Sequence, residues 1–114
     1  MKTISNVFDI QKAFSGHWTD FDNLAPEERE QRAKDYLLEI YGEVDELKKE
    51  IDTKAWRRSG SGNITEIKKE ASDVLAYLIS ICLCYGITGE EFADTYVEKM
   101  KQNEKEYNER RNRR

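Results

Sequence analysis

The chain has few of the residues that interrupt helices. Its 114 residues include one proline and six glycines. A sheet sandwich needs many more turn-forming residues, so this scarcity argues against one. Charged residues make up 37% and apolar residues 38% of the chain, a balance typical of amphipathic helices. We therefore expect an all-α fold, and the length fits one domain, residues 1–114, and not two.

Cysteine is also scarce, with only Cys82 and Cys84 in the whole chain. On a helix, residues two apart point to different faces, so these two thiols are placed neither for a disulfide nor for a shared metal. That usage fits a reducing cytoplasm, which is the location we expect.

Long apolar runs are absent. The first 15 residues contain charges of both signs and no continuous apolar block, so no cleavable signal is expected. The most apolar stretch, from Val74 to Ile87, is interrupted by Ser80 and Gly86 and is shorter than the ~20 residues of a membrane span. The sequence therefore predicts a soluble protein without a membrane partner.

A strong positive charge is lacking too, since the formal net charge is −4. This balance argues against a surface that coats nucleic acid. The end of the chain, residues 108–114, is locally basic, and we interpret it as a solvated tail. A nucleic-acid binder that works through this tail remains an alternative, and cutting the chain after Asn108 would then abolish binding.

Apolar periodicity and capping residues predict four helices. Pro26 favours the first turn of a long helix, Asn63 with Glu66 and Thr88 with Glu91 are capping-box patterns, and Gly86 is a stop signal. Residues 16–25 and the Ser/Gly run 59–62 have no helical period and are expected as connections. The four expected helices cover about Thr3 to Phe14, Pro26 to Thr53, Ile64 to Tyr85 and Gly89 to Arg110.

Two pairs of carboxylates lie at helical spacing. Glu43 and Glu46 are three residues apart, beside the apolar stripe of the second helix, although a solvated acidic face is an equally good interpretation of this pair alone. Glu70 and Asp73 repeat the spacing on a helix that is apolar nearly all round. We expect such a helix to be buried, and a buried carboxylate needs a cation. An all-oxygen set suits Mg²⁺, which also bridges phosphate oxygens.

The last helix has a second polar signal. Its apolar stripe includes Tyr96, Met100 and Tyr107, and Asn103 lies in the middle of that stripe with Lys99 one turn earlier. An ammonium and an amide together could hold the phosphates and sugar of one ligand. The alternative is a buried Asn that sets helix register beside a solvated Lys.

Three motifs follow one another along the chain: Gly42-Glu43-Val44-Asp45-Glu46-Leu47, Glu70-Ala71-Ser72-Asp73-Val74-Leu75-Ala76-Tyr77-Leu78 and Lys99-Met100-x-x-Asn103. Together they resemble the all-α nucleoside triphosphate pyrophosphatase superfamily, which includes MazG-like enzymes, dimeric dUTPases and dCTP pyrophosphatases. The family pattern is Glu-x-x-Glu, a gap and Glu-x-x-Asp, and here 23 residues separate Glu46 from Glu70. The resemblance extends over about residues 36–107.

The resemblance implies a four-helix-bundle-like MazG-type fold and a Mg²⁺ cofactor, with Mn²⁺ as the alternative. It implies that a metal-held water attacks the α-phosphorus of a nucleoside triphosphate, and that the monophosphate and pyrophosphate are released. Glu46 and Glu43 are then the catalytic candidates, with Glu46 orienting or deprotonating the water. The implied metal ligands are Glu43, Glu46, Glu70 and Asp73.

The resemblance also implies residues that bind substrate, which are Lys99, Asn103, Tyr77, Trp56, Trp18 and His17. For the aromatic residues the plain alternative is core packing, and a lone loop histidine is more often incidental. The chain departs from the family in two places. Gly42 stands where many MazG proteins have a glutamate, and no arginine follows Asn103. These departures leave the nucleotide base open.

We therefore expect a Mg²⁺-dependent pyrophosphohydrolase that removes a (deoxy)nucleoside triphosphate such as dUTP, dCTP or a modified nucleotide. The third helix has more apolar surface than one chain can cover, which predicts a homodimer or a dimer of dimers. The alternative is a non-catalytic helical module that binds nucleotide or protein.

Overall fold

The computed structural model describes residues 2–55 and 64–113. The chain is all-α, as predicted, with four α-helices and one short 3-10 helix in the described part. Every helix boundary that the sequence predicted lies within two residues of the observed one. The helices are α1 (Ile4–Ser15), η1 (Phe21–Asn23), α2 (Pro26–Ala55), α3 (Ile64–Cys84) and α4 (Gly89–Asn112).

Local chemistry explains where these helices begin and end. Capping boxes at Thr3 and Thr88 satisfy the first backbone N–H groups of α1 and α4. Gly86 has a φ of 68°, and the Ile87 N–H donates to the Cys82 carbonyl in a Schellman motif that ends α3. The predicted cap at Asn63 lies outside the described residues.

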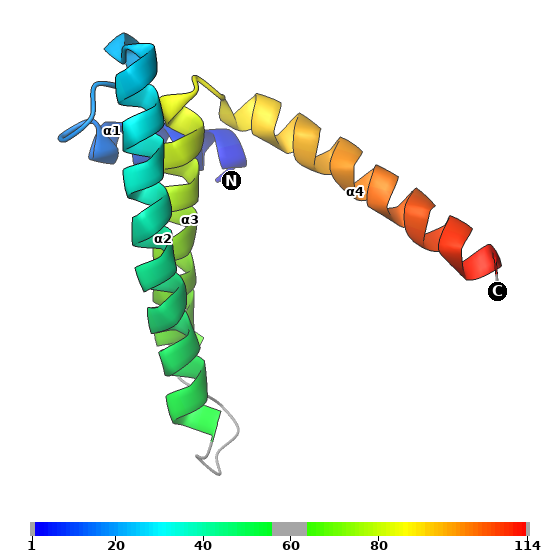
Figure 1. The fold of residues 1–114 in the computed structure, drawn as a ribbon. Coiled ribbons are helices and arrows are strands. Elements are labelled where there is room, and N and C mark those ends of the chain that lie inside the picture. The colour runs from blue at the N-terminus through cyan, green and yellow to red at the C-terminus, as the bar shows by residue number, and fades with distance from the viewer. Residues whose placement is uncertain (1, 56–63, 114) are drawn as a thin grey trace.

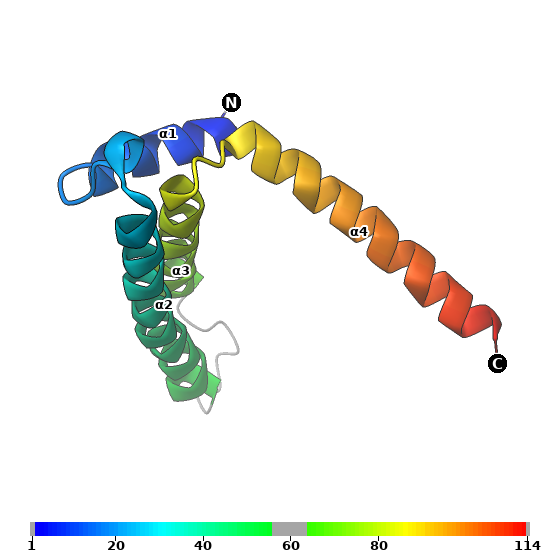
Figure 2. The same cartoon turned by 45° about the horizontal axis from the view of Figure 1, so that its top comes forward.

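The helices form a long hairpin crossed at one end (Figures 1 and 2). α2 and α3 lie side by side over most of their length, and α1 crosses the end of α3 that leads to Gly86. α4 packs against α1 and then projects away from the hairpin, at 107° to α3 (Figure 1). The residues of the basic end, which we expected as a tail, continue α4 through Asn112.

The buried core is small and lies where α1 crosses the hairpin. Its centre is formed by Phe8, Ile79 and the two cysteines, whose thiols are free, and burial raises their thiol pKa values. The remaining buried apolar residues are Phe21, Ala33 and Leu83. In the described part of the chain, no single helix is long and apolar enough to cross a membrane, and α3 and α4 meet that criterion only as a bent pair.

The burial of α3 differs from the prediction. We expected a helix buried along its whole length, but its buried residues all lie between Ile79 and Cys84. Further toward its start α3 has α2 on one side, and Leu75 and Leu78 remain 38% and 40% exposed. The apolar sequence of α3 therefore predicted more burial than one chain provides.

Candidate metal centre and adjoining pocket

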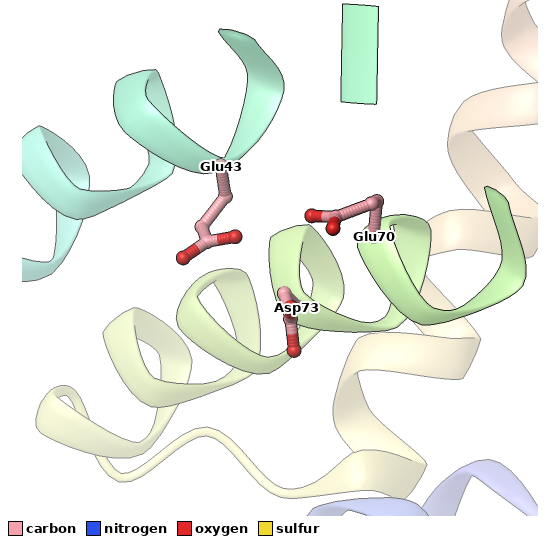
Figure 3. Close-up of side chains that lie close together, drawn as sticks. All are labelled: Glu43, Glu70 and Asp73. Atoms are coloured by element: carbon pink, nitrogen blue, oxygen red, sulfur yellow. The ribbon is translucent and has the colours of Figure 1, made fainter. Parts of the chain in front are cut away.

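Three acidic side chains converge between α2 and α3. Glu43 comes from α2, and Glu70 and Asp73 come from α3, each offering one oxygen within 4.8 Å of the others. Figure 3 shows Glu43 and Glu70 extending toward the space between the two helices, with Asp73 one turn from Glu70. The spacing of three residues places Glu70 and Asp73 on the same face of α3, and the packing of the hairpin brings Glu43 opposite them.

The three carboxylates repel one another. Partial burial raises the pKa of Glu43, and the charges of Asp73 and Glu70 raise it further. The pKa of Glu70 is also raised, first by partial burial and then by the charges of Asp73 and Glu46. Among residues 2–55 and 64–113, no basic side chain forms an ion pair with any of the three. This excess of negative charge favours a bound cation.

The donor set fits a hard divalent cation. Mg²⁺ and Mn²⁺ prefer carboxylate oxygens and water, whereas Zn²⁺ in proteins is usually held by nitrogen or sulfur ligands. One oxygen from each of three carboxylates leaves room for water and for phosphate oxygens. The residues present are therefore suited to a magnesium-type site.

Two predicted members of this centre, Glu46 and Asp73, do not lie as the sequence led us to expect. Glu46 is exposed and lies outside the group of three, although its charge helps to raise the pKa values of Glu43 and Glu70. Asp73 belongs to the group, but it is exposed, so the expectation that burial forces it to bind a cation is wrong. The reason for a cation at Asp73 is the proximity of Glu43 and Glu70.

A pocket of about 520 Å³ adjoins the centre and shares Glu43 and Asp73 with it. This volume is within the ~300–1,000 Å³ that small-molecule sites usually have. Tyr77 and Trp18, two aromatic residues predicted to bind substrate, line this pocket. Tyr77 packs near Tyr36, with 6.1 Å between the ring centroids, and Trp18 lies against Phe14. The walls come from α1, the loop that follows it, α2 and α3.

Sequence analysis missed several residues of this pocket. Arg32, Tyr36 and Glu39 precede Glu43 on α2 at steps of three or four, and Asp35 lies four residues before Glu39, so the helical period alone could have placed them on its face. No comparable signal existed for the residues of α1 and its loop, because only the tertiary fold brings α1 across α3. These residues are Gln11, Phe14, Ser15 and Thr19.

The other predicted substrate residues are not at the pocket of this chain. His17 is exposed, and it contacts the rings of Phe14 and Trp18 but does not line the pocket. Lys99 and Asn103 are exposed on α4, which points away from the hairpin (Figure 1). Trp56 lies outside the described residues.

The described residues thus form an all-α hairpin with a group of three carboxylates and an aromatic-lined pocket beside it. Comparison with protein families matches residues 31–107 to the MazG nucleotide pyrophosphohydrolase domain. The chain belongs to this family, which implies a hydrolase of nucleoside triphosphates in general terms. No curated protein and no solved structure gives a significant match.

Proposed function

We propose that this protein is a Mg²⁺-dependent pyrophosphohydrolase that converts a (deoxy)nucleoside triphosphate to the monophosphate and pyrophosphate. The observation that carries the proposal is the group formed by Glu43, Glu70 and Asp73, which has an aromatic pocket beside it. The centre fits the metal that accompanies a triphosphate, and the pocket has the size of a small-molecule site. dCTP, dUTP and their modified forms are the substrates to test first.

In this proposal the acidic residues have two roles, metal binding and activation of water. Glu43, Glu70 and Asp73 would hold the cation, which when bound lowers the pKa of water and offsets the charge of the phosphates. Glu46 is exposed beside them and would orient or deprotonate the attacking water. Tyr77 and Trp18 would pack against the nucleoside in the adjoining pocket.

A panel of nucleoside triphosphates incubated with Mg²⁺, with Mn²⁺ and with EDTA tests this proposal. The expected result is release of monophosphate and pyrophosphate in equal amounts, dependent on the metal. Release of inorganic phosphate would contradict the assigned bond cleavage. Nucleotide binding without any monophosphate release would instead favour the non-catalytic module.

We further propose that a second copy of the chain completes the molecule. α4 makes few contacts beyond α1, and its apolar stripe is exposed, with Tyr96 at 57%, Met100 at 41% and Tyr107 at 58%. The hairpin also has exposed apolar side chains, which are Leu37, Val44, Ile51, Leu75 and Leu78. Apolar side chains gathered on a projecting helix usually mark a protein interface.

Such an assembly would also bring basic groups to the acidic centre. Lys99 and Asn103 lie on or beside the stripe of α4, which projects away from the hairpin that carries the carboxylates of the same chain (Figure 1). In a homodimer whose α4 packs on the hairpin of the partner subunit, these two side chains would face the phosphates. We therefore expect Lys99 and Asn103 to act on the substrate bound by the second copy.

A further inference from the structure

A row of hydrogen-bonded side chains runs from the pocket into the core. The Gln11 amide nitrogen lies 2.7 Å from the Ser15 Oγ, which lies 3.1 Å from the Ser80 Oγ. The Ser80 hydroxyl donates to the Ala76 carbonyl over 2.9 Å. Ser15 and Ser80 are 4% and 1% exposed, so water does not compete for these bonds.

The direction of every bond in this row is fixed by its last member. A backbone carbonyl only accepts, so the single hydroxyl proton of Ser80 is used on Ala76. The Ser15 hydroxyl must then donate to Ser80, and the Ser15 oxygen is left to accept from Gln11. Gln11 therefore turns its NH₂ group toward Ser15.

This arrangement determines what Gln11 offers to a ligand. Gln11 is half-buried and lines the pocket, and its carbonyl oxygen accepts no hydrogen bond from any residue in 2–55 or 64–113. If the amide turned over, the Gln11 carbonyl oxygen would face the Ser15 oxygen, and neither could donate to the other. Ser15 could donate to Gln11 only by giving up its hydrogen bond to Ser80. Either arrangement has one hydrogen bond fewer than the observed row. The row thus keeps a carbonyl acceptor available to the pocket.

Through Ser15, Gln11 is joined to the part of α3 that lies beyond Asp73. Ser80 is seven residues beyond Asp73 on α3, which is roughly 10 Å along a helix. Phosphates held at the carboxylates would place the sugar near Ala76 and Tyr77 and the outer edge of the base near Gln11. That edge carries the exocyclic group that distinguishes amino bases from keto bases.

We propose that Gln11, oriented by Ser15 and Ser80, selects a base with an exocyclic amine over its keto counterpart. This inference rests on the proposed function for the position of the phosphates. The amine of cytosine or adenine donates to the Gln11 carbonyl, whereas the keto oxygen of uracil or hypoxanthine meets another acceptor there. One hydrogen bond lost from the row corresponds to roughly a three- to tenfold preference.

Binding of non-hydrolysable α,β-methylene triphosphates, measured by calorimetry with Mg²⁺, tests the inference separately from catalysis. We expect the analogue of dCTP to bind three- to tenfold more tightly than that of dUTP, or the analogue of dATP to exceed that of dITP by the same factor. Equal affinities within both pairs, tighter binding of the keto base, or no binding of any analogue would overturn it. Selective binding without turnover would leave it standing and would reject only the proposed hydrolysis.

Variants separate the contact from its orientation. Gln11→Met keeps the length of the side chain without its amide, and it should bring the affinity ratio of each pair close to one. Ser80→Ala leaves Gln11 in place, but the Ser15 hydroxyl is then free to bond to either end of the Gln11 amide. The affinity ratio should therefore fall. The melting temperature of this variant shows whether the fold is retained. Ser72→Ala is the matched control, because Ser72 is exposed and makes the same bond to the carbonyl four residues earlier, that of Lys68. A ratio unchanged in Gln11→Met, or reduced as much in Ser72→Ala as in Ser80→Ala, would refute the assignment.

Discussion

Glu43, Glu70 and Asp73 each place one carboxylate oxygen within 4.8 Å of the others, and the proposed chemistry depends on this group. Their negative charges repel one another, and this repulsion contributes to the raised pKa values of Glu43 and Glu70. Such repulsion is useful where a divalent cation and a polyphosphate bind together. The spacing in the sequence predicted these three acids together with Glu46, but the packing of the hairpin decides which of them lie close together.

Replacing one acid of the centre should abolish most of the activity. We expect Asp73→Asn to lower kcat/KM for the preferred triphosphate by at least roughly a hundredfold, because one charged ligand of the cation is lost. Circular dichroism should show that the helices survive. Asp45→Asn is the matched control on α2, since Asp45 forms an exposed ion pair with Lys49 outside the centre. Full activity of Asp73→Asn with Mg²⁺ would remove Asp73 from its assigned role.

In the metal-free protein, Glu43 and Glu70 should contribute more to the stability of the fold in mild acid than at neutral pH. Their folded pKa values lie above the ordinary 4.5, so the folded state binds protons more readily than the unfolded state. The stability they contribute is fully present below that value and is lost as the pH rises through their folded pKa values. Melting temperatures in EDTA, measured from about pH 4 to pH 7, report this loss.

The double variant Glu43→Gln with Glu70→Gln provides the comparison for that pH series. Its melting temperature should fall less between mild acid and neutral pH than that of the unchanged protein. Mg²⁺ should stabilise the unchanged protein more at neutral pH, where the carboxylates are ionised, than at pH 4. The same response to Mg²⁺ in the double variant would argue against a cation at these residues.

At the scale of helices, the sequence was a good guide because caps and stops act locally. Thr88 with Glu91 begins α4 and Gly86 ends α3, both as their residue types predicted. Burial was less predictable, because it depends on which helices cover a face. α3 is apolar on several sides, but its first turns are covered by α2 alone and its buried residues begin at Ile79.

The turn at Gly86 allows a direct test of this local chemistry. Gly86→Ala should destabilise the fold by about 1–2 kcal/mol, because its φ of 68° is unfavourable for a residue with a Cβ. Each kcal/mol lost lowers the melting temperature by roughly 4–8 °C. No atom of the described residues lies within 4 Å of the added Cβ, so we assign the whole loss to backbone strain.

Gly42 provides the opposite case within α2. A Cβ there also meets no atom of residues 2–55 or 64–113 within 4 Å, and the helical backbone suits alanine. Gly42→Ala should therefore stabilise the protein by about 0.5–1 kcal/mol. Thermal unfolding of both variants at one protein concentration checks the pair, and destabilisation by Gly42→Ala would indicate that another subunit packs against this position.

At the scale of the whole molecule, α4 packs against no other described helix along most of its length (Figure 2). An amphipathic helix of 24 residues gains little stability by itself in water, so its apolar stripe needs a partner. A homodimer would supply one and would also bring Lys99 and Asn103 to a centre that lacks basic groups of its own among the described residues.

The assembly can be tested by one charge on each face of α4. Met100→Asp should weaken self-association by at least roughly tenfold, because it places a charge in an apolar interface. Gln102→Asp adds the same charge to the opposite face and should have little effect, since Gln102 only bonds to Glu106 on the surface. Sedimentation velocity over a dilution series measures both. A monomeric unchanged protein, or equal effects of the two variants, would contradict this assembly.

The sequence by itself determined the helical class, the helix boundaries and the acidic motifs, because caps, periodicity and residue spacing act over a few residues. The tertiary structure decided which acids meet, and it decided the second half of the pocket. Ser15 and Ser80 are 65 residues apart in the chain, and only the crossing of α1 over the hairpin places their hydroxyls in contact. Contacts of that kind depend on the packing of whole helices, and no local pattern encodes them.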